Sequence, residues 1–411
     1  MNIFEISSAL ITISAGLMYI NFKFLKLPMT IGLMLLSLIF SFFILLVGFS
    51  FPEVEAFAYS IVSNIDFNIT LMGGMLSFLL FAGSLHVDLN DLLEQKVIIS
   101  ILATLGVVFS TFVVGTITYY LLGLFSINID YIYCLLFGSL ISPTDPIAVL
   151  GILKETNSPK SLKTAIAGES LFNDGVGVVV FTVILSLLSS TAHISFSEIS
   201  FLFIEEAIGG IAFGLLIGYL FFKLLKSVDN YPLEIMLTLA LVMGGYSLAS
   251  HLHLSGPLAM VVAGLFIGNH GKMFAMSDTT HKQLFSFWEL IDEFLNALLF
   301  VLIGFEVLII SFDISYLLAG IILIPLILLV RFIGITIPLT IMGSKTNLSK
   351  GSNLVMTWCG LRGGISIALA LSLPESPEKS LIITITYIVV AFSILVQGLT
   401  SKRVVDSIVD A

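Results

Sequence analysis

Long apolar segments recur along the whole 411-residue chain, and this recurrence constrains the fold more than any other feature. A helix needs about 20 mainly apolar residues to cross the hydrocarbon core of a bilayer. The composition agrees, because 58% of the residues are hydrophobic and only 11% are charged, whereas soluble domains carry about 25% charged residues. The sequence therefore predicts an all-α polytopic membrane protein.

Windows of about 20 residues divide the chain into about thirteen transmembrane helices. The predicted spans are 4–22, 28–48, 67–85, 97–124, 130–153, 165–191, 199–226, 232–250, 255–269, 285–311, 315–342, 351–374 and 380–399. The links between them are short. We therefore expect a single integral membrane unit over residues 1–411, without a soluble domain.

The basic residues test this division. Of the 17 Lys and Arg residues, all but three fall in odd-numbered links or the C-terminal tail; the exceptions are Lys379, in an even-numbered link, and Arg331 and Arg362, within spans. Cytoplasmic links of membrane proteins carry an excess of Lys and Arg. We therefore expect the N-terminus outside, the C-terminus in the cytoplasm, and a location in the bacterial inner membrane.

Charge, cysteines and motifs exclude several classes. A net charge of −10 argues against a nucleic-acid partner. Cys134 and Cys359 both lie within apolar spans, so no disulfide framework is expected. The sequence contains neither a Walker A loop nor a His-Glu-x-x-His zinc motif, and it lacks the Gly-x-Ser-x-Gly elbow of hydrolases. We expect a transporter without a cofactor, and not an enzyme.

An odd number of spans permits an inverted repeat. Two six-span units joined by one extra span repeat at an odd offset, which reverses their direction through the bilayer. Spans five and twelve are then counterparts, and both contain helix breakers: Pro143 and Pro146 in one, Gly360, Gly363 and Gly364 in the other. Paired interrupted helices mark the binding site of secondary transporters. We predict two inverted six-helix repeats, with interrupted helices five and twelve crossing near the midplane.

Charged residues deep within spans need an explanation, because each costs about 2.5–3.5 kcal/mol at the bilayer centre on insertion scales. They are Asp145, Glu169, Asp174, Glu306, Arg331 and Arg362. Others, such as Glu289, Asp292 and Glu293, lie near span ends, where a side chain reaches water at low cost. The deep charges are therefore the candidate functional residues.

Span five contains Ser142-Pro143-Thr144-Asp145-Pro146. Each proline leaves a backbone carbonyl without its helical donor, and bare carbonyls at membrane depth are tolerated only beside a cavity or a ligand. Together with the Thr144 hydroxyl and the Asp145 carboxylate they predict an oxygen-rich site for a hard cation. Alternatively, Asp145 neutralises the dipole of a neighbouring half-helix.

Span six places Ser170, Asn173 and Asp174 on one helical face, whereas Glu169 points about 140° away from Asp174. This face offers a hydroxyl, an amide and a carboxylate within one turn. We predict Asp174 as the exchangeable site; the alternative is that it only bonds a neighbouring helix. Arg362 cannot lose its charge, and we predict Glu169 as its structural ion-pair partner; the alternative is that Arg362 repels unbound cations. Arg331 and Glu306 are candidates for a second pair between spans eleven and ten.

Three motifs in this order and spacing resemble the monovalent cation:proton antiporters of the NhaP/NHE type. They are Ser142-Pro143-Thr144-Asp145-Pro146, Gly168-Glu169-Ser170-Leu171-Phe172-Asn173-Asp174-Gly175 and Gly360-Leu361-Arg362-Gly363-Gly364. The resemblance covers essentially the full chain. It implies exchange of Na⁺ or Li⁺ for H⁺, with the ion at Asp174, Thr144 and Ser170 and with Asn173 in support. The Asn173-Asp174 pair resembles the electroneutral branch.

The resemblance also implies a homodimer in membrane lipid, with elevator-like motion of an ion-carrying part against a dimerisation part. We expect the ion-carrying part at about 67–191, 285–311 and 351–399, and the dimerisation part at about 1–48, 199–269 and 315–342. One departure is Ala82, where many bacterial members have a glutamate. K⁺/H⁺ exchange, electrogenic exchange and a gated cation channel remain as alternatives.

Overall fold

The structure is a computed structural model that describes residues 3–54, 70, 74–145, 149, 153, 156, 158–189, 196–308, 313–343, 346, 348–349 and 351–409. Within these ranges the chain is helical and forms no β-strand. The predicted all-α class is therefore confirmed. Pro146, the second proline of the predicted break in span five, lies outside the described residues.

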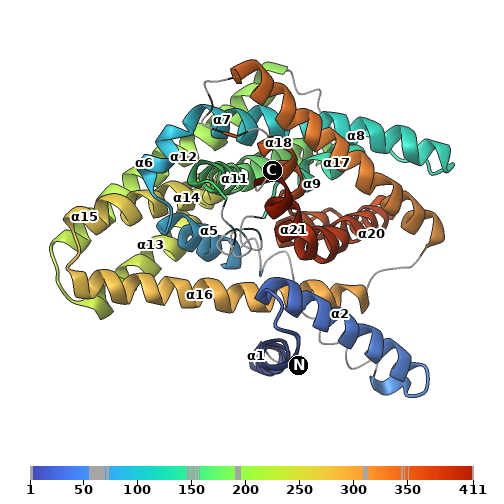
Figure 1. The fold of residues 1–411 in the computed structure, drawn as a ribbon, viewed down its shortest axis with the longest axis horizontal. Coiled ribbons are helices and arrows are strands. Elements are labelled where there is room, and N and C mark those ends of the chain that lie inside the picture. Colours follow the sequence, from blue (N-terminus) through green and yellow to red (C-terminus); the bar gives the residue numbers. More distant parts are fainter. Residues whose placement is uncertain are drawn as a thin grey trace.

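The helices follow the predicted spans (Figure 1). In chain order they are α1 (Ile3–Ile20) with η1 (Asn21–Leu25), α2 (Met29–Gly48), α5 (Leu76–Leu85), α6 (Leu89–Glu94), α7 (Lys96–Ile101) with η3 (Leu102–Gly106) and α8 (Val107–Leu124), α9 (Tyr131–Ile141), α11 (Lys160–Ser189), α12 (Phe196–Lys226), α13 (Tyr231–His251), α14 (Gly256–Phe266) with η4 (Ile267–Gly271), α15 (Lys272–Phe274), α16 (Asp278–Phe305) with η5 (Glu306–Leu308), α17 (Ile314–Met342), α18 (Ser352–Trp358), α19 (Gly364–Leu371), and α20 (Pro377–Phe392) with η7 (Ser393–Gln397) and α21 (Gly398–Val409). Within the described ranges, eight continuous helical segments are long and apolar enough to cross a membrane. The total of thirteen spans stays a prediction.

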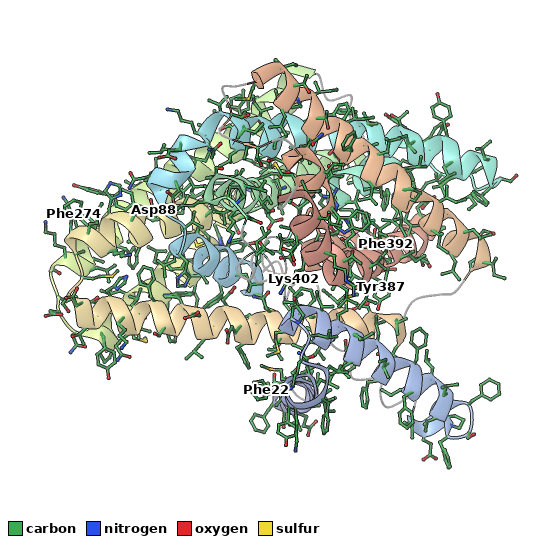
Figure 2. All side chains as sticks on the ribbon, viewed as in Figure 1. Phe22, Asp88, Phe274, Tyr387, Phe392 and Lys402 are labelled. Atoms are coloured by element: carbon green, nitrogen blue, oxygen red, sulfur yellow. The ribbon has the colours of Figure 1, made fainter. Side chains whose placement is uncertain are left out.

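The outer surface carries large apolar side chains, as expected of a protein that faces lipid. Phe22 and Phe274 stand on the periphery in Figure 2, with exposed fractions of 77% and 59%. Soluble proteins also expose apolar atoms, but a surface rich in exposed Phe, Leu and Ile over many helices belongs to a membrane-embedded molecule. The chain is an integral membrane protein.

Short polar signals start several of these helices. The Asn230 side chain accepts a hydrogen bond from the Leu233 N–H at the start of α13, and Ser255 and Ser376 cap α14 and α20 in the same way. A proline follows each cap at the first or second helical position, where it removes no needed donor. These three starts could be recognised in the sequence alone.

Two helices are interrupted at the centre of the molecule, as predicted. α9 ends at Ile141, just before Pro143, and α18 and α19 are separated by the non-helical residues Cys359–Gly363. The two breaks lie against each other, because the Asp145 N–H donates to the Leu361 carbonyl at 2.7 Å. Each break therefore satisfies part of the backbone of the other.

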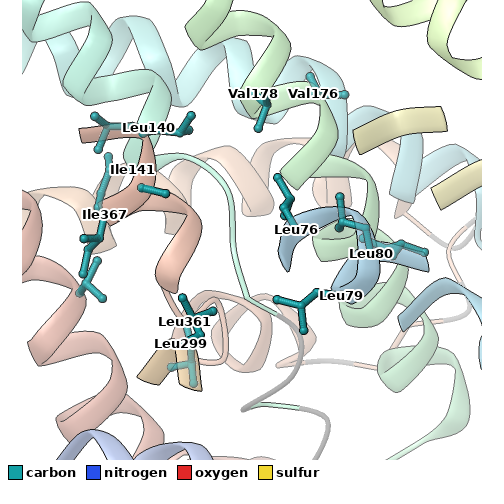
Figure 3. Close-up of a cluster of buried hydrophobic side chains, with 14 of the residues drawn as sticks. Leu76, Leu79, Leu80, Leu140, Ile141, Val176, Val178, Leu299, Leu361 and Ile367 are labelled. Atoms are coloured by element: carbon teal, nitrogen blue, oxygen red, sulfur yellow. The ribbon is translucent and has the colours of Figure 1, made fainter. Parts of the chain in front are cut away.

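Apolar side chains surround the crossing and exclude lipid from it. Figure 3 shows Leu140 and Ile141 at the end of α9 and Leu361 and Ile367 beside the break of α18 and α19, all 0–2% exposed. α9 packs against α8, α11 and α19, and α17 packs against α8, α18 and α20. The crossing thus lies inside one bundle of α8, α9, α11, α17, α18–α19 and α20.

The links that we expect in the cytoplasm meet at one end of the bundle. Lys160 forms a 2.8 Å ion pair with Asp91, joining the links that precede α7 and α11. Asn269 accepts a 2.9 Å hydrogen bond from the Leu89 N–H, and the Ser277 hydroxyl donates to Asp229 at 2.8 Å. These contacts join residues of odd-numbered links and the last residue of span nine, Asn269, to one another, and the orientation of this end in the membrane stays a prediction.

Close packing of α8 on α9 leaves no space for a side chain at position 138. A Cβ on Gly138 would overlap the α8 backbone at Thr111, whereas Gly123 on α8 faces open space. We expect Gly138→Ala to destabilise the protein by about 1–3 kcal/mol, the usual cost of overpacking. The measurement is the apparent Tm of the detergent-solubilised protein. Gly123→Ala is the matched control and should leave Tm unchanged or raise it.

Candidate ion-binding site

Asp174 occupies the middle of the 30-residue helix α11 and is 5% exposed. The carboxylate of Asp145 and the guanidinium of Arg362, which come from the two helix breaks, lie within electrostatic range of it. A carboxylate buried at this depth is costly unless something neutralises it. Asp174 is therefore a candidate for the binding of a positive charge, as the sequence predicts.

A network of neutral oxygens stands beside this carboxylate. The Asn173 amide holds Thr144 at two points: its Nδ2 donates to the Thr144 hydroxyl at 2.9 Å, and its Oδ1 accepts from the Thr144 N–H at 3.2 Å. The hydroxyls of Thr144 and Ser170 lie 2.9 Å apart. All three side chains are buried. The structure thus brings together Thr144, Ser170 and Asn173, three of the predicted site residues, and Asp174 follows Asn173 on the same face of α11.

Arg362 satisfies the carbonyls that the break in α9 leaves free. Its Nη1 donates to the carbonyl of Pro143 at 2.8 Å and, at shorter distance, to that of Ser142. The Arg362 backbone N–H donates to the Ser393 hydroxyl of η7 at 2.9 Å. A single arginine therefore fixes the unwound part of α9 to the break between α18 and α19.

The structure corrects the predicted Glu169–Arg362 ion pair. Glu169 instead forms a bidentate pair with Arg331 of α17, with Nη1–Oε1 at 3.0 Å and Nη2–Oε2 at 3.2 Å. Both side chains are less than one-tenth exposed. Glu169 does face away from Asp174, as the helical angle predicts, but α17 lies on that side of α11. Arg362 lies within electrostatic range of Glu169, but its Nη1 donates to backbone carbonyls of the break in α9 instead.

Arg331 also joins a third helix. Its Nε and Nη2 donate to the carbonyl of Met356 in α18, at 3.3 and 3.2 Å. Arg331 does not pair with Glu306, the deep carboxylate of span ten, since its guanidinium donates to Glu169 and Met356. Spacing along the sequence could not show this, because the partner helix, α11, is separated from α17 by more than a hundred residues.

Two glycines in the break make room for these charged side chains. A Cβ on Gly363 would overlap the carboxylate of Asp145, and a Cβ on Gly360 would overlap the guanidinium of Arg331. Neither glycine has a positive φ, so the requirement is space and not backbone conformation. The helix-breaking glycines of span twelve thus admit side chains from α17 and from the break of α9.

A small cavity of about 30 Å³ lies next to the site. Its lining includes Ser142, Glu169, Asn173, Arg331 and Arg362, so both arginines and the carbonyl-bearing segment border it. A polar cavity of this size has room for about two water molecules. Ala82, by contrast, is fully buried on α5 and adds no oxygen ligand.

Comparison with known proteins agrees with this geometry. The profile of the family described as sodium/hydrogen exchanger, transmembrane, matches residues 9–406. The chain is 49% identical over 401 residues to the protein named Na(+)/H(+) antiporter NhaP of Pseudomonas aeruginosa, covering 96% of this chain and 95% of that one. It is 34% identical over 392 residues to the Na(+)/H(+) antiporter NhaH of Halobacillus dabanensis, covering 94% and 93%.

The fold matches a solved structure along its whole length. The sodium proton antiporter MjNhaP1 from Methanocaldococcus jannaschii superimposes with a TM-score of 0.77 at 21% identity, covering 100% of both chains. The molecule is a secondary active transporter and not an enzyme. The chain belongs to the sodium/hydrogen exchanger family.

The buried pair of Glu169 and Arg331 yields a stability prediction. Arg331→Met leaves the Glu169 carboxylate buried without its partner, which should cost about 3–5 kcal/mol. We expect most of that variant to be lost as unfolded protein on detergent extraction, measured by size-exclusion chromatography. The double variant Glu169→Leu/Arg331→Met should recover folded protein, because neither charge then remains buried.

Lys379→Met serves as the control, since the Lys379–Glu375 pair joins residues four apart and its glutamate is 91% exposed. Loss of such a pair changes stability by less than about 0.5 kcal/mol. If the double variant is no more stable than Arg331→Met alone, the pair does not hold the three helices together.

Proposed function

We propose that this protein is a Na⁺/H⁺ antiporter that exchanges one Na⁺ or Li⁺ for one H⁺ at Asp174. The observation that carries the proposal is a single deeply buried carboxylate beside two hydroxyls, at the crossing of two broken helices. The names of the relatives, antiporters that are 49% and 34% identical over nearly the full chain, support the choice of ions.

In this proposal the cation is held by Asp174 with the hydroxyls of Thr144 and Ser170. Oxygen ligands suit a hard cation such as Na⁺, and the 2.9 Å contact between the hydroxyls keeps both near one point. Asn173 positions Thr144 through its two hydrogen bonds. Asp145 adds negative charge at the edge of the site.

Exchange follows if Asp174 accepts a cation or a proton but not both. A bare carboxylate pays a large desolvation cost on crossing an apolar gate, whereas either neutralised form moves more readily. Asn173 supports an electroneutral stoichiometry, because an uncharged amide next to Asp174 leaves a single carboxylate on this face of α11 to carry the exchanged charge.

An elevator-like motion requires a bundle that moves as a unit. The packing of α8, α9, α11, α17, α18–α19 and α20 around the crossing favours these helices as the ion-carrying part. α5 and α16 pack with α2, α13 and α14 instead. Compared with the division expected from the sequence, the proposal moves α17 into the ion-carrying part and α5 and α16 into the other part.

We propose further that the protein is a homodimer in the bacterial inner membrane, with the N-terminus outside and the C-terminus in the cytoplasm. The contacts among the lysine-bearing links support one common end for these links, and the excess of lysine there favours the cytoplasm. The exposed apolar face of α12, which includes Ile204, Ile208 and Leu215, suits lipid or a second copy.

Replacement of the central carboxylate is the direct test. Asp174→Asn should abolish Na⁺-driven proton flux while leaving the protein folded, because the amide keeps the shape and loses the exchangeable charge. The measurement is the fluorescence of a trapped pH dye in proteoliposomes after addition of Na⁺, Li⁺ or K⁺. Asp130→Asn, the same change at an exposed residue, should retain wild-type flux.

Full flux in Asp174→Asn vesicles would rule out Asp174 as the exchange site. The same assay separates the other candidate functions. A response to K⁺ equal to that for Na⁺ indicates K⁺/H⁺ exchange, a dependence on membrane potential indicates electrogenic exchange, and ion conduction without proton movement indicates a channel.

Competition at one carboxylate also predicts the pH dependence. We expect the apparent KM for Na⁺ to rise as the pH falls, because protons occupy Asp174 more of the time. The maximal rate at saturating Na⁺ should change less than KM. The measurement is initial flux against Na⁺ concentration at several symmetrical pH values. A KM that is independent of pH would show that proton and cation use different groups.

A further inference from the structure

A stripe of polar side chains runs along one face of α16, outside the site described above. Glu289, Asp292, Glu293 and Asn296 follow one another at intervals of three, one and three residues, which places them on one side of the helix. Glu289 and Glu293 are exposed, Asp292 is partly buried, and Asn296 at the end of the stripe is only 4% exposed. The stripe leads from the surface into the protein.

Asn296 ends the stripe with a buried oxygen that lacks a donor. Its Nδ2 donates to the Asp292 carboxylate oxygen Oδ1 at 3.1 Å and to the Asp292 carbonyl at 2.8 Å. Its Oδ1, attached to the same carbon, is buried without a hydrogen-bond partner among the described residues. Buried polar atoms without partners are rare in native proteins. The Oδ1 atom of Asn296 belongs to the amide that bonds the Asp292 carboxylate, so a cation or a cation-bound water held by Asp292 could serve as its missing partner.

The position of the stripe favours water over lipid beside it. α16 has 28 residues, which corresponds to about 42 Å of helix, against about 30 Å of hydrocarbon. Glu289, Asp292 and Glu293 lie in the first third of the predicted span 285–311, near the end from which side chains reach water. Three like charges in succession do not neutralise one another, so they favour water or cations beside them.

The stripe is coupled to the central site. The carboxylate of Asp292 lies close enough to that of Asp145 for the two charges to interact, and Asp145 interacts in the same way with Asp174. α16 also packs against α19, which begins at the break of span twelve. A cation at Asp292 would thus lie within electrostatic range of Asp145.

We propose that Asp292 and Asn296 form a second, weaker site for a partly hydrated monovalent cation, on the path from the end of the bundle where α16 begins (Figure 1) to Asp174. This inference rests on the proposed function, because the second site supplies the ion that Asp174 exchanges. Asp292 provides the charge, the Oδ1 of Asn296 provides a neutral oxygen, and water completes the shell. Glu289 and Glu293 raise the local cation concentration at the mouth.

A purely structural role for Asp292 is the competing explanation, in which it only accepts the hydrogen bonds of Asn296. The variant Asp292→Asn distinguishes the structural role from the proposed cation site, because its amide oxygen still accepts from Asn296 and only the charge is lost. Under the structural role this variant behaves as wild type. Under the proposal it loses the second site.

The first test measures Na⁺ binding by ²³Na NMR line broadening on purified, detergent-solubilised protein at alkaline pH. We compare wild type, Asp174→Asn, Asp292→Asn and the double variant. The proposal expects Asp174→Asn to retain the weaker component of binding and the double variant to lose it. If Asp174→Asn and the double variant bind Na⁺ equally, the second site is absent, while Asp174 still stands. If wild type and Asp174→Asn bind equally, it is the assignment of Asp174 that fails.

The second test measures transport with Na⁺ on the side where α16 begins. Asp292→Asn should raise the apparent KM about tenfold, the size expected on removing one partly solvated charge at contact distance, with kcat nearly unchanged. Asp292→Glu should restore most of the affinity, and Asn296→Leu should raise KM although it removes no charge. Glu94→Gln is the matched control: the same loss of charge on exposed α6, at the same end of the bundle.

An unchanged KM in folded, monodisperse Asp292→Asn overturns the proposal, as does an equal KM increase in Glu94→Gln, which would reduce the effect to general surface charge. Loss of kcat without a change in KM also overturns it, because it assigns Asp292 to the conformational step.

Discussion

The central constraint in this protein is the backbone of two helices that are interrupted inside the bundle. The protein must supply donors for the carbonyls left free there, because lipid offers none. Arg362 does so for the carbonyls of Ser142 and Pro143, and the Asp145 N–H and the Leu361 carbonyl satisfy each other. The two breaks are therefore interdependent, and the face of α11 that carries Ser170 and Asn173 contacts Thr144 beside them.

The charges follow from this arrangement. Because Arg362 is occupied by carbonyls, Glu169 takes its counter-ion from α17, and Arg331 ties α11, α17 and α18 together. The pair and the crossing form one frame, within which the Asn173 amide holds Thr144. Among the described residues Asp174 forms no salt bridge, and the proposed exchange of its ion requires such an unpaired carboxylate.

The polar stripe on α16 provides the proposed path from the surface to the central site. A buried carboxylate can exchange its ion only if the ion reaches it through oxygens, and Asp292 with Asn296 offers such oxygens one step from Asp145. The frame and the path come from different helices: α9, α11, α17 and α18–α19 build the first, and α16 contributes the second. Relative motion of these two groups would change how they connect.

The sequence by itself determined the all-α membrane fold, the two interrupted helices and the shared face of Ser170, Asn173 and Asp174, because hydropathy, helix breakers and helical angles are local properties. That Thr144 lies beside Ser170 and Asn173 was implied by the family resemblance and is a feature of the tertiary structure. It also showed that Glu169 faces away from Asp174. Only the tertiary structure decided which arginine meets Glu169 and that Asp292 lies near Asp145. Those partners lie on helices more than a hundred residues apart in sequence, and no local pattern specifies which buried charge a neighbouring helix presents.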